Sequence, residues 1–169
     1  MSGSSTTFRG RPVDGHRLAE FVYGTVTGLV AITGIGAHPE GGWAGTAGIV
    51  VAGAIAIWLA HGYSIMLSKR LTLGRRLSGQ EISQVFRGSW PIVIAGLVLA
   101  IPMLLSGLGL WTLDTAVAIA GWLGVAVLAL VGLLAGSLTH ETWPRRLLIA
   151  GVYAGLGLLV VTIEFVVHH

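Results

Sequence analysis

Long apolar stretches alternate with short polar ones along the whole chain. Five stretches hold few charged residues, and they cover residues 18–36, 43–67, 90–107, 113–136 and 147–167. Each is close to the ~20 residues that an α-helix needs to cross the hydrocarbon of a bilayer. A spanning segment must satisfy its backbone N–H and C=O groups internally, and stretches of this length do so as helices. The pattern therefore predicts an all-α, polytopic membrane bundle of about five transmembrane helices.

The composition supports a membrane environment. Hydrophobic residues make up 54% of the chain and charged residues only 10%, which is too little polar surface to cover a folded protein in water. The five stretches and their connections use most of the 169 residues, so we expect one transmembrane domain over residues 16–169. Residues 1–15, rich in Ser, Thr, Gly and Arg, are typical of a disordered cytoplasmic tail.

The positive charges follow the predicted topology. All ten Lys and Arg residues fall on one side of the alternating stretches. They are Arg9, Arg11, Arg17, Lys69, Arg70, Arg75, Arg76, Arg87, Arg145 and Arg146. By the positive-inside rule that side faces the cytoplasm, so we expect a cytoplasmic N-terminus in a multi-pass protein of the cell membrane. Because the net charge of +3 follows the topology and forms no separate patch, the expected partner is membrane lipid and not nucleic acid.

The long polar connection over residues 68–89 has a helical pattern of its own. Ser78 and Glu81 have the spacing of a capping box, and the apolar residues Ile82 and Phe86 follow them. We therefore expect a short amphipathic helix along the cytoplasmic interface. The basic residues before it, at positions 69–76, suit anionic lipid headgroups or serve only to set the topology.

Pro102 lies inside the third apolar stretch. It cannot donate a hydrogen bond to the carbonyl of Val98, so it predicts a kink in that helix. The kink either accommodates packing or belongs to a gate.

Small residues recur at every fourth position of the second stretch. They are Ala44, Gly48, Ala52, Ala56, Ala60 and Ser64. Such a flat stripe lets another helix approach closely, either within the chain or between chains. Gly132 with Gly136, and Gly151 with Gly155, repeat the spacing in the last two stretches.

One face of the first stretch is polar and small. It carries Glu20, Gly24, Thr27, Gly28, Ala31 and Gly34. One interpretation is conservative, because Arg17 stands three residues before Glu20 and the two would form an ion pair at the interface. The other is functional: an ionisable group near membrane depth is costly and often marks a pathway, so this face is a candidate ion route.

His61 is the second ionisable group within an apolar stretch. It is suited to a structural hydrogen bond, to proton transfer or to a metal site. A metal site would need further ligands at matching spacing, and the sequence offers none, so we expect no metal and no cofactor. No nucleophile, base or phosphate-binding loop is arranged as in a known enzyme motif, so we do not expect an enzyme.

Two short motifs resemble a known family. The segment Arg17-Leu-Ala-Glu-Phe21-Val-Tyr-Gly24 resembles the Arg-x-x-x-Phe-Ser-Asp start of the transmembrane protein 175 family of bacterial and lysosomal potassium channels, and Trp58-Leu-Ala-His61 resembles the Trp-x-x-His of its second helix. The resemblance implies that Arg17, Phe21, Trp58 and His61 form a structural collar and that the first helix lines the pore. Val22 and Tyr23 replace the Ser and Asp of the family motif, so potassium selectivity is not implied.

The sequence thus leaves two classes of function open. In the first, the chain is a homo-oligomeric, cation channel-like protein whose first helix lines the route of a monovalent cation. In the second, it is a non-conducting helical subunit or assembly factor of a larger membrane complex, with its small-residue stripes as docking surfaces. A small transporter is a further alternative.

Overall fold

The protein is an assembly of helices. The computed structural model describes residues 7–8, 11–12, 15–36, 41–139 and 141–167. The helices are α1 (Gly15–Gly36), α2 (Gly42–Leu73), α3 (Gly79–Gly88), α4 (Pro91–Gly107), α5 (Leu113–Leu138) and α6 (Trp143–Val167). The predicted all-α membrane class is confirmed, and the five apolar stretches correspond to α1, α2, α4, α5 and α6.

The segment predicted as a disordered tail contains two very short strands. β1 (Thr7–Phe8) and β2 (Arg11–Pro12) pair in antiparallel register ahead of α1. The remaining residues of that segment up to position 14 lie outside the described residues.

Four helical stretches in the described part of the chain are long and apolar enough to cross a membrane. They are α2, the stretch Gly79–Gly107 with α4 as its apolar part, α5, and α6 up to Ile163. α1 has 22 residues, a length of about 33 Å at the usual helical rise, but is not one of the four.

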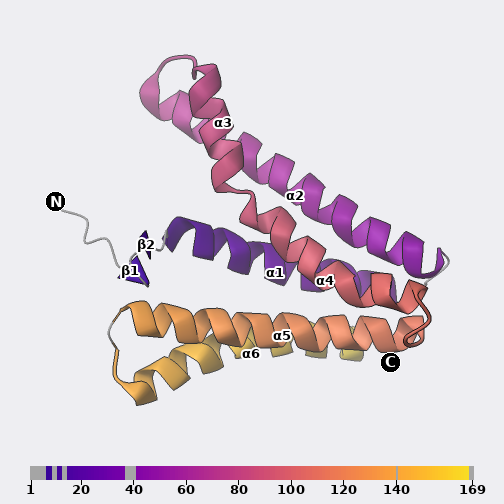
Figure 1. Cartoon of the computed structure of the whole chain (residues 1–169). Helices are drawn as coiled ribbons and strands as arrows, with labels where there is room; N and C mark the ends of the chain where they lie inside the picture. The colour runs from indigo at the N-terminus through magenta and orange to yellow at the C-terminus, as the bar shows by residue number, and fades with distance from the viewer. Residues whose placement is uncertain (1–6, 9–10, 13–14, 37–40, 140, 168–169) are drawn as a thin grey trace.

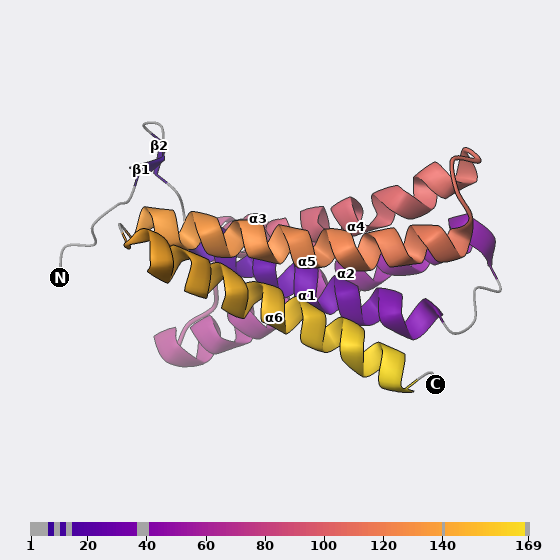
Figure 2. The ribbon, with the colours of Figure 1, turned by 90° about the horizontal axis from the view of Figure 1, so that it is seen from below.

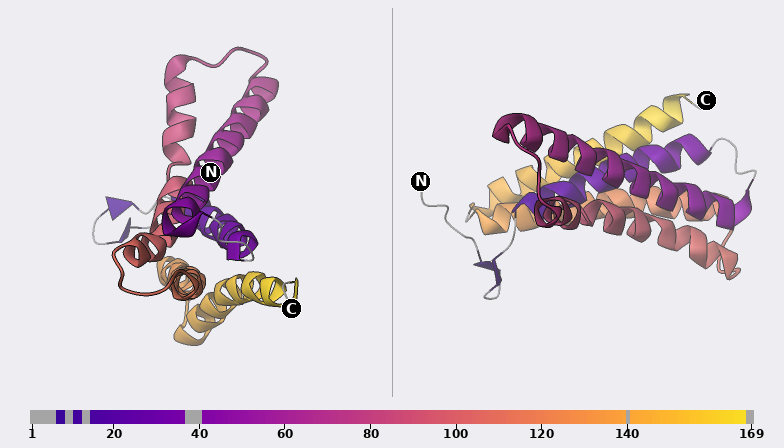
Figure 3. Two further views of the ribbon diagram at one scale, coloured as in Figure 1. Left: turned by 90° about the vertical axis from the view of Figure 1, so that its right-hand side faces the viewer. Right: turned by 90° about the horizontal axis from the view of Figure 1, so that it is seen from above.

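α1 is the central helix of the bundle. It contacts α2, α4, α5 and α6, and Figures 1 and 3 show it between the α2–α4 side and the α5–α6 side. Figure 2 shows α6 lying across the face opposite α4. A core cluster joins α1, α2, α4 and α5 through Ile32, Val50, Leu99, Met103 and Ala120. A helix in this position is shielded from lipid by its neighbours, which explains why it can contain ionisable residues.

α2 and α3 form a hairpin that projects from the bundle (Figures 1 and 3). α2 ends where Gly74 adopts a left-handed conformation, with φ of 62° and its N–H bonded to the carbonyl of Arg70. α3 then folds back on α2, and the ring of Phe86 occupies the space left by the missing side chain of Gly62, where a Cβ would lie 2.5 Å from the ring. The expected amphipathic helix of the long connection is α3, which packs by its apolar side.

α4 begins at Pro91 and continues through Pro102. Pro102 is buried, and its carbonyl accepts a hydrogen bond of 3.0 Å from the indole N–H of Trp111. The bond ties the turn between α4 and α5 to the proline region of α4.

Candidate functional site

A carboxylate is buried between two helices at the end of the bundle that holds the positive charges. Glu20 of α1 is only 4% exposed, and its Oε1 lies 2.9 Å from Nε2 of His61 on α2. Nε2 of His16 lies 3.4 Å from the same oxygen. The ring of Tyr23 packs on the imidazole of His61, with 5.3 Å between the centroids. Residues 16, 20 and 23 share one helical face, so α1 presents all three to α2.

The partners of Glu20 are histidines. The sequence pattern favoured Arg17, but within the described residues the side chains that contact the carboxylate of Glu20 are those of His16 and His61. The contact with His16 could have been expected from its i,i+4 spacing. The contact with His61 could not, because 41 residues separate the two.

The second oxygen of this carboxylate has no partner. Oε2 of Glu20 is buried and makes no hydrogen bond within the described residues. An ionised carboxylate accepts hydrogen bonds at both oxygens, whereas a protonated one can also donate. A buried carboxylate with an unsatisfied oxygen favours any state that neutralises it, such as a bound proton or a small cation. The described residues contain no group of three or more His, Asp or Glu suited to a metal ion.

The candidate ion route on α1 faces helices of its own chain. A Cβ on Gly24 would lie 2.7 Å from the Cα of Ile92 in α4, and one on Gly28 would lie 2.7 Å from Cδ1 of Leu99. A Cβ on Gly53 of α2 would lie 4.0 Å from the Cβ of Ala31, whereas a Cβ on Gly34 would have nothing within 4 Å. The hydroxyl of Thr27 donates to carbonyls of its own helix, at Tyr23 and Gly24. The face therefore packs closely on α4 at its two middle glycines.

Of the four residues that the resemblance assigned to a structural collar, three lie near this site. Arg17 and Trp58 line one pocket with residues of α3 and the start of α4, and His61 lies one helical turn from Trp58 and binds Glu20. Phe21, the fourth, is half-buried on α1, where its carbonyl accepts a hydrogen bond of 2.8 Å from the hydroxyl of Thr25. The resemblance did not indicate α3, which completes the pocket.

The small-residue stripe of α2 faces outward. All six of its residues are exposed in the single chain: Ala44, Gly48, Ala52, Ala56, Ala60 and Ser64. The glycines of α5 behave differently, because Gly132 packs on the backbone of Ala150, and Gly136 on that of Arg146 in α6. Gly151 and Gly155 of α6 have open space. The small-residue stripes of α2 and α6 therefore do not pack closely on other helices within the described part of the chain.

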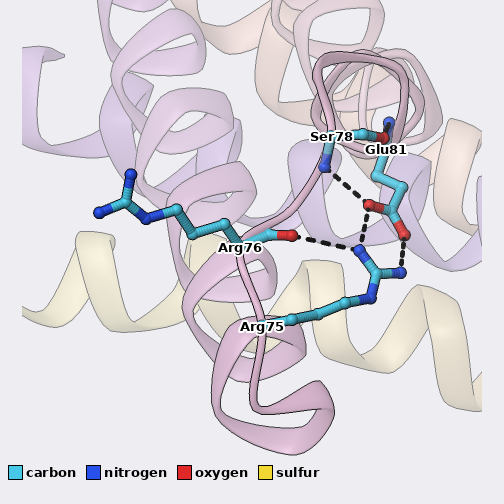
Figure 4. Close-up of polar contacts among 4 residues, drawn as sticks. All are labelled: Arg75, Arg76, Ser78 and Glu81. Carbon is cyan, nitrogen blue, oxygen red and sulfur yellow. Dashed lines mark hydrogen bonds and ion pairs between the residues drawn. The ribbon is translucent and has the colours of Figure 1, made fainter.

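The turn between α2 and α3 is held by an ion pair. The guanidinium of Arg75 binds both oxygens of Glu81 at 2.7 and 3.0 Å, and the N–H of Ser78 donates to the same carboxylate at 2.8 Å (Figure 4). These bonds, first that from Arg75 and then that from Ser78, lower the pKa of Glu81 to about 2. The capping box predicted from the sequence is present, and Arg75 extends it.

No known family model, curated protein or solved structure matches this chain.

Proposed function

We propose that this chain is a multi-pass integral membrane protein that takes up a small cation, either a proton or a monovalent metal ion, at the Glu20–His61 pair. The observation that carries the proposal is the buried carboxylate of Glu20, with one oxygen bonded to His61 at 2.9 Å and the other without a hydrogen-bond partner among the residues that the structure describes. Ionisable groups inside membrane bundles are costly, and by default they mark an ion or proton pathway.

The charge states of the pair explain the uptake. An ionised Glu20 beside a neutral His61 has one negative charge, and a proton or monovalent cation cancels it. A buried charge without a compensating partner is costly, and a cation bound beside the carboxylate of Glu20 would offset that cost. The ring of Tyr23 packs on that of His61, whose side chain is 30% exposed, whereas Glu20 is buried.

Glu20 belongs to the start of α1, and most of the described positive residues belong to the start of α1, the α2–α3 hairpin and the start of α6. These three segments lie on the same side of the bundle (Figure 1). The positive-inside rule assigns this end to the cytoplasm. In this proposal the cation enters from the cytoplasmic side, and the chains assemble as a homo-oligomer through the outward stripe of α2.

Ion flux through purified protein in liposomes tests the proposal. We expect Glu20→Gln to reduce proton or potassium flux to background, because it removes the charge but keeps the shape. Thr27→Val should reduce flux by less, since its hydroxyl already bonds to its own helix. Glu141→Gln is the matched control, because Glu141 also lies at the charged end but is paired with Arg145 at 3.1 Å. Equal flux through the Glu20 and Glu141 variants would contradict the role of the pair.

A second function is favoured by the packing of α1. The close contacts of Gly24 and Gly28 with α4 leave no space for an ion at these two positions of the face. This favours a non-conducting helical subunit in which Glu20 and His61 only join α1 to α2. The same flux measurement decides between the two, because background leak in the unsubstituted protein and in every variant supports the non-conducting subunit.

A further inference from the structure

Two buried side-chain oxygens have no hydrogen-bond partner in the part of the chain that the structure describes. They are Oε2 of Glu20 on α1 and Oγ of Ser89, the residue that follows α3. Glu20 is 4% exposed and Ser89 is 0% exposed. A buried polar group without a partner costs free energy, so each of these oxygens is suited to a ligand that the protein itself does not supply.

The two oxygens belong to one contact between α1 and the start of α4. One turn beyond Glu20, a Cβ on Gly24 would lie 2.7 Å from the Cα of Ile92. One turn before Glu20, Nε2 of His16 lies 3.7 Å from the place of a Cβ on Gly88. The carboxylate and the serine hydroxyl lie between these two contacts along their own segments. The packing therefore brings both oxygens to the same level of the bundle.

The hydroxyl of Ser89 differs from those of the two buried threonines. Thr25 and Thr46 are each 1% exposed, and each donates to the carbonyl four residues earlier, at 2.8 and 2.9 Å. This is the usual bond of a buried hydroxyl in a helix. Ser89 makes no such bond among the described residues, so its hydroxyl is not engaged by its own helix.

The chain is not a continuous helix at this point. α3 ends at Gly88 and α4 begins at Pro91, and Figure 1 shows the bend between them. Pro91 has no N–H, so the carbonyl of Arg87 does not receive the bond that residue 91 would supply in a continuous helix. The N–H groups of Ile92 and Val93 are bonded to carbonyls of the bend, at 3.1 and 3.0 Å. A carbonyl without its helical donor, beside N–H groups that are already engaged, suits a cation.

The charge of the carboxylate determines which cation fits. Both histidines contact Oε1 of Glu20, at 2.9 and 3.4 Å, so Oε2 is the oxygen left for a ligand. One monovalent cation cancels one buried carboxylate, whereas a divalent cation would leave an excess charge inside the bundle. The close approach of α1 to α4 at Gly24 favours a small ion.

We propose that Oε2 of Glu20, Oγ of Ser89 and a backbone carbonyl at the end of α3 bind one sodium ion between α1 and the α3–α4 bend. The inference rests on the proposed function and deepens it, because it identifies the cation as a small alkali-metal ion and adds Ser89 to the site. The carboxylate balances the charge of the ion, and the hydroxyl and carbonyl supply neutral oxygen ligands. His61 orients the carboxylate through Oε1.

Thermal unfolding of the detergent-solubilised full chain tests the site. The buffers contain NaCl, KCl or choline chloride at equal ionic strength and equal pH. A ligand that binds only the folded chain raises the melting temperature as its concentration increases. We expect the largest rise with Na⁺, a smaller rise with K⁺ and none with choline. Equal melting temperatures in NaCl and choline chloride would overturn the proposal and leave water as the partner of the two oxygens.

Ser89→Ala separates an ion ligand from a structural hydroxyl. In choline chloride this variant should unfold at the parental temperature or above it, because it removes a buried hydroxyl that has no protein partner. Its response to Na⁺ should move to about tenfold higher concentrations, since one oxygen ligand is lost. Glu20→Gln should lose the response. Ser83→Ala, at an exposed position of α3, is the matched control and should keep it. An unchanged Na⁺ response in Ser89→Ala would contradict the site.

Binding and flux together separate this inference from the proposed function. If Na⁺ stabilises the parent more than Ser89→Ala while flux through liposomes stays at background, the sodium site is right and the proposed uptake is wrong. If proton flux depends on Glu20 while Na⁺ leaves the melting temperature unchanged, the proposed uptake is right and the sodium site is wrong.

Discussion

At the scale of single residues, glycines determine how closely the helices approach. Gly24 of α1 lies directly on the backbone of Ile92, and Gly62 accommodates the ring of Phe86. Gly34 belongs to the same helix as Gly24, but nothing lies within 4 Å of its would-be Cβ. These positions have the same residue type and different environments, so they allow a matched comparison.

Gly24→Ala should destabilise the protein, whereas Gly34→Ala should not. The methyl group at position 24 would lie 2.7 Å from a backbone atom, and overpacking of this kind costs about 1–3 kcal/mol. At position 34 only the helix propensity changes, which favours Ala by up to about 1 kcal/mol. Thermal unfolding in detergent measures both variants. A melting temperature of Gly24→Ala equal to or above that of Gly34→Ala would contradict the close α1–α4 packing.

At the scale of elements, the turn of the α2–α3 hairpin lies away from the packed core of the bundle. The side chains of residues 67–76 are exposed, and the order of the turn depends on the bonds among Arg75, Ser78 and Glu81 (Figure 4). The start of α3 therefore depends on the ionisation of one carboxylate. This dependence gives the element its own response to pH.

The hairpin should lose order when the pH falls through the acid range. The pKa of Glu81 is about 2 in the folded chain and 4.5 ordinarily. A lowered pKa stabilises the folded hairpin above pH 4.5, and this contribution is lost as the pH falls from 4.5 towards 2. Amide hydrogen exchange of α3, corrected for its intrinsic pH dependence, measures the change. In Glu81→Gln the protection of residues 79–82 should be lower and independent of pH over this range, whereas Glu141→Gln should keep the parental profile.

At the scale of the whole molecule, the bundle leaves helix surfaces uncovered. α2 contacts α1, α3 and α4, but its small-residue stripe is exposed. In lipid, exposed apolar side chains carry no penalty, and a flat stripe gains from close packing with a second helix. The arrangement fits the proposed homo-oligomer, in which the stripe meets its counterpart in another chain.

Ala52→Leu with Ala56→Leu should weaken the assembly and leave the single chain folded. Both positions are exposed, so larger side chains do not enter the core of the chain, but they separate two stripes that pack face to face. The mass of the complex in nanodiscs measures the effect, with Ala118→Leu and Ala126→Leu on the exposed side of α5 as the control pair. A monomeric unsubstituted protein would rule out assembly through this face.

The orientation of the bundle can be measured with single cysteines, because the chain has none of its own. We expect Gln80→Cys on α3 to react with a membrane-impermeant thiol reagent only from the cytoplasmic side. Leu110→Cys, in the turn between α4 and α5, should react only from the opposite side. Both positions are exposed. Reaction of both from one side would contradict the topology that follows from the positive residues.

The sequence by itself determined the helices and most of their ends. The apolar stretches predicted α1, α2, α4, α5 and α6, because each segment in lipid must satisfy its own backbone hydrogen bonds. The capping box predicted the start of α3 for an equally local reason, since Ser78 and Glu81 lie within one turn. These features depend on neighbours in the chain and need no knowledge of the fold.

Only the tertiary structure decided which faces meet. In water the polar side of a helix marks its exposed face, but in lipid the exposed and the buried faces are both apolar, so the sequence pattern does not distinguish them. The stripe of α2 therefore looked equally suited to internal and external packing, and the structure leaves it outside. The meeting of Glu20 with His61, and of Arg17 with Arg87 across one pocket, joins residues far apart in the chain. These contacts follow from the shapes of packed helices, which no local pattern contains.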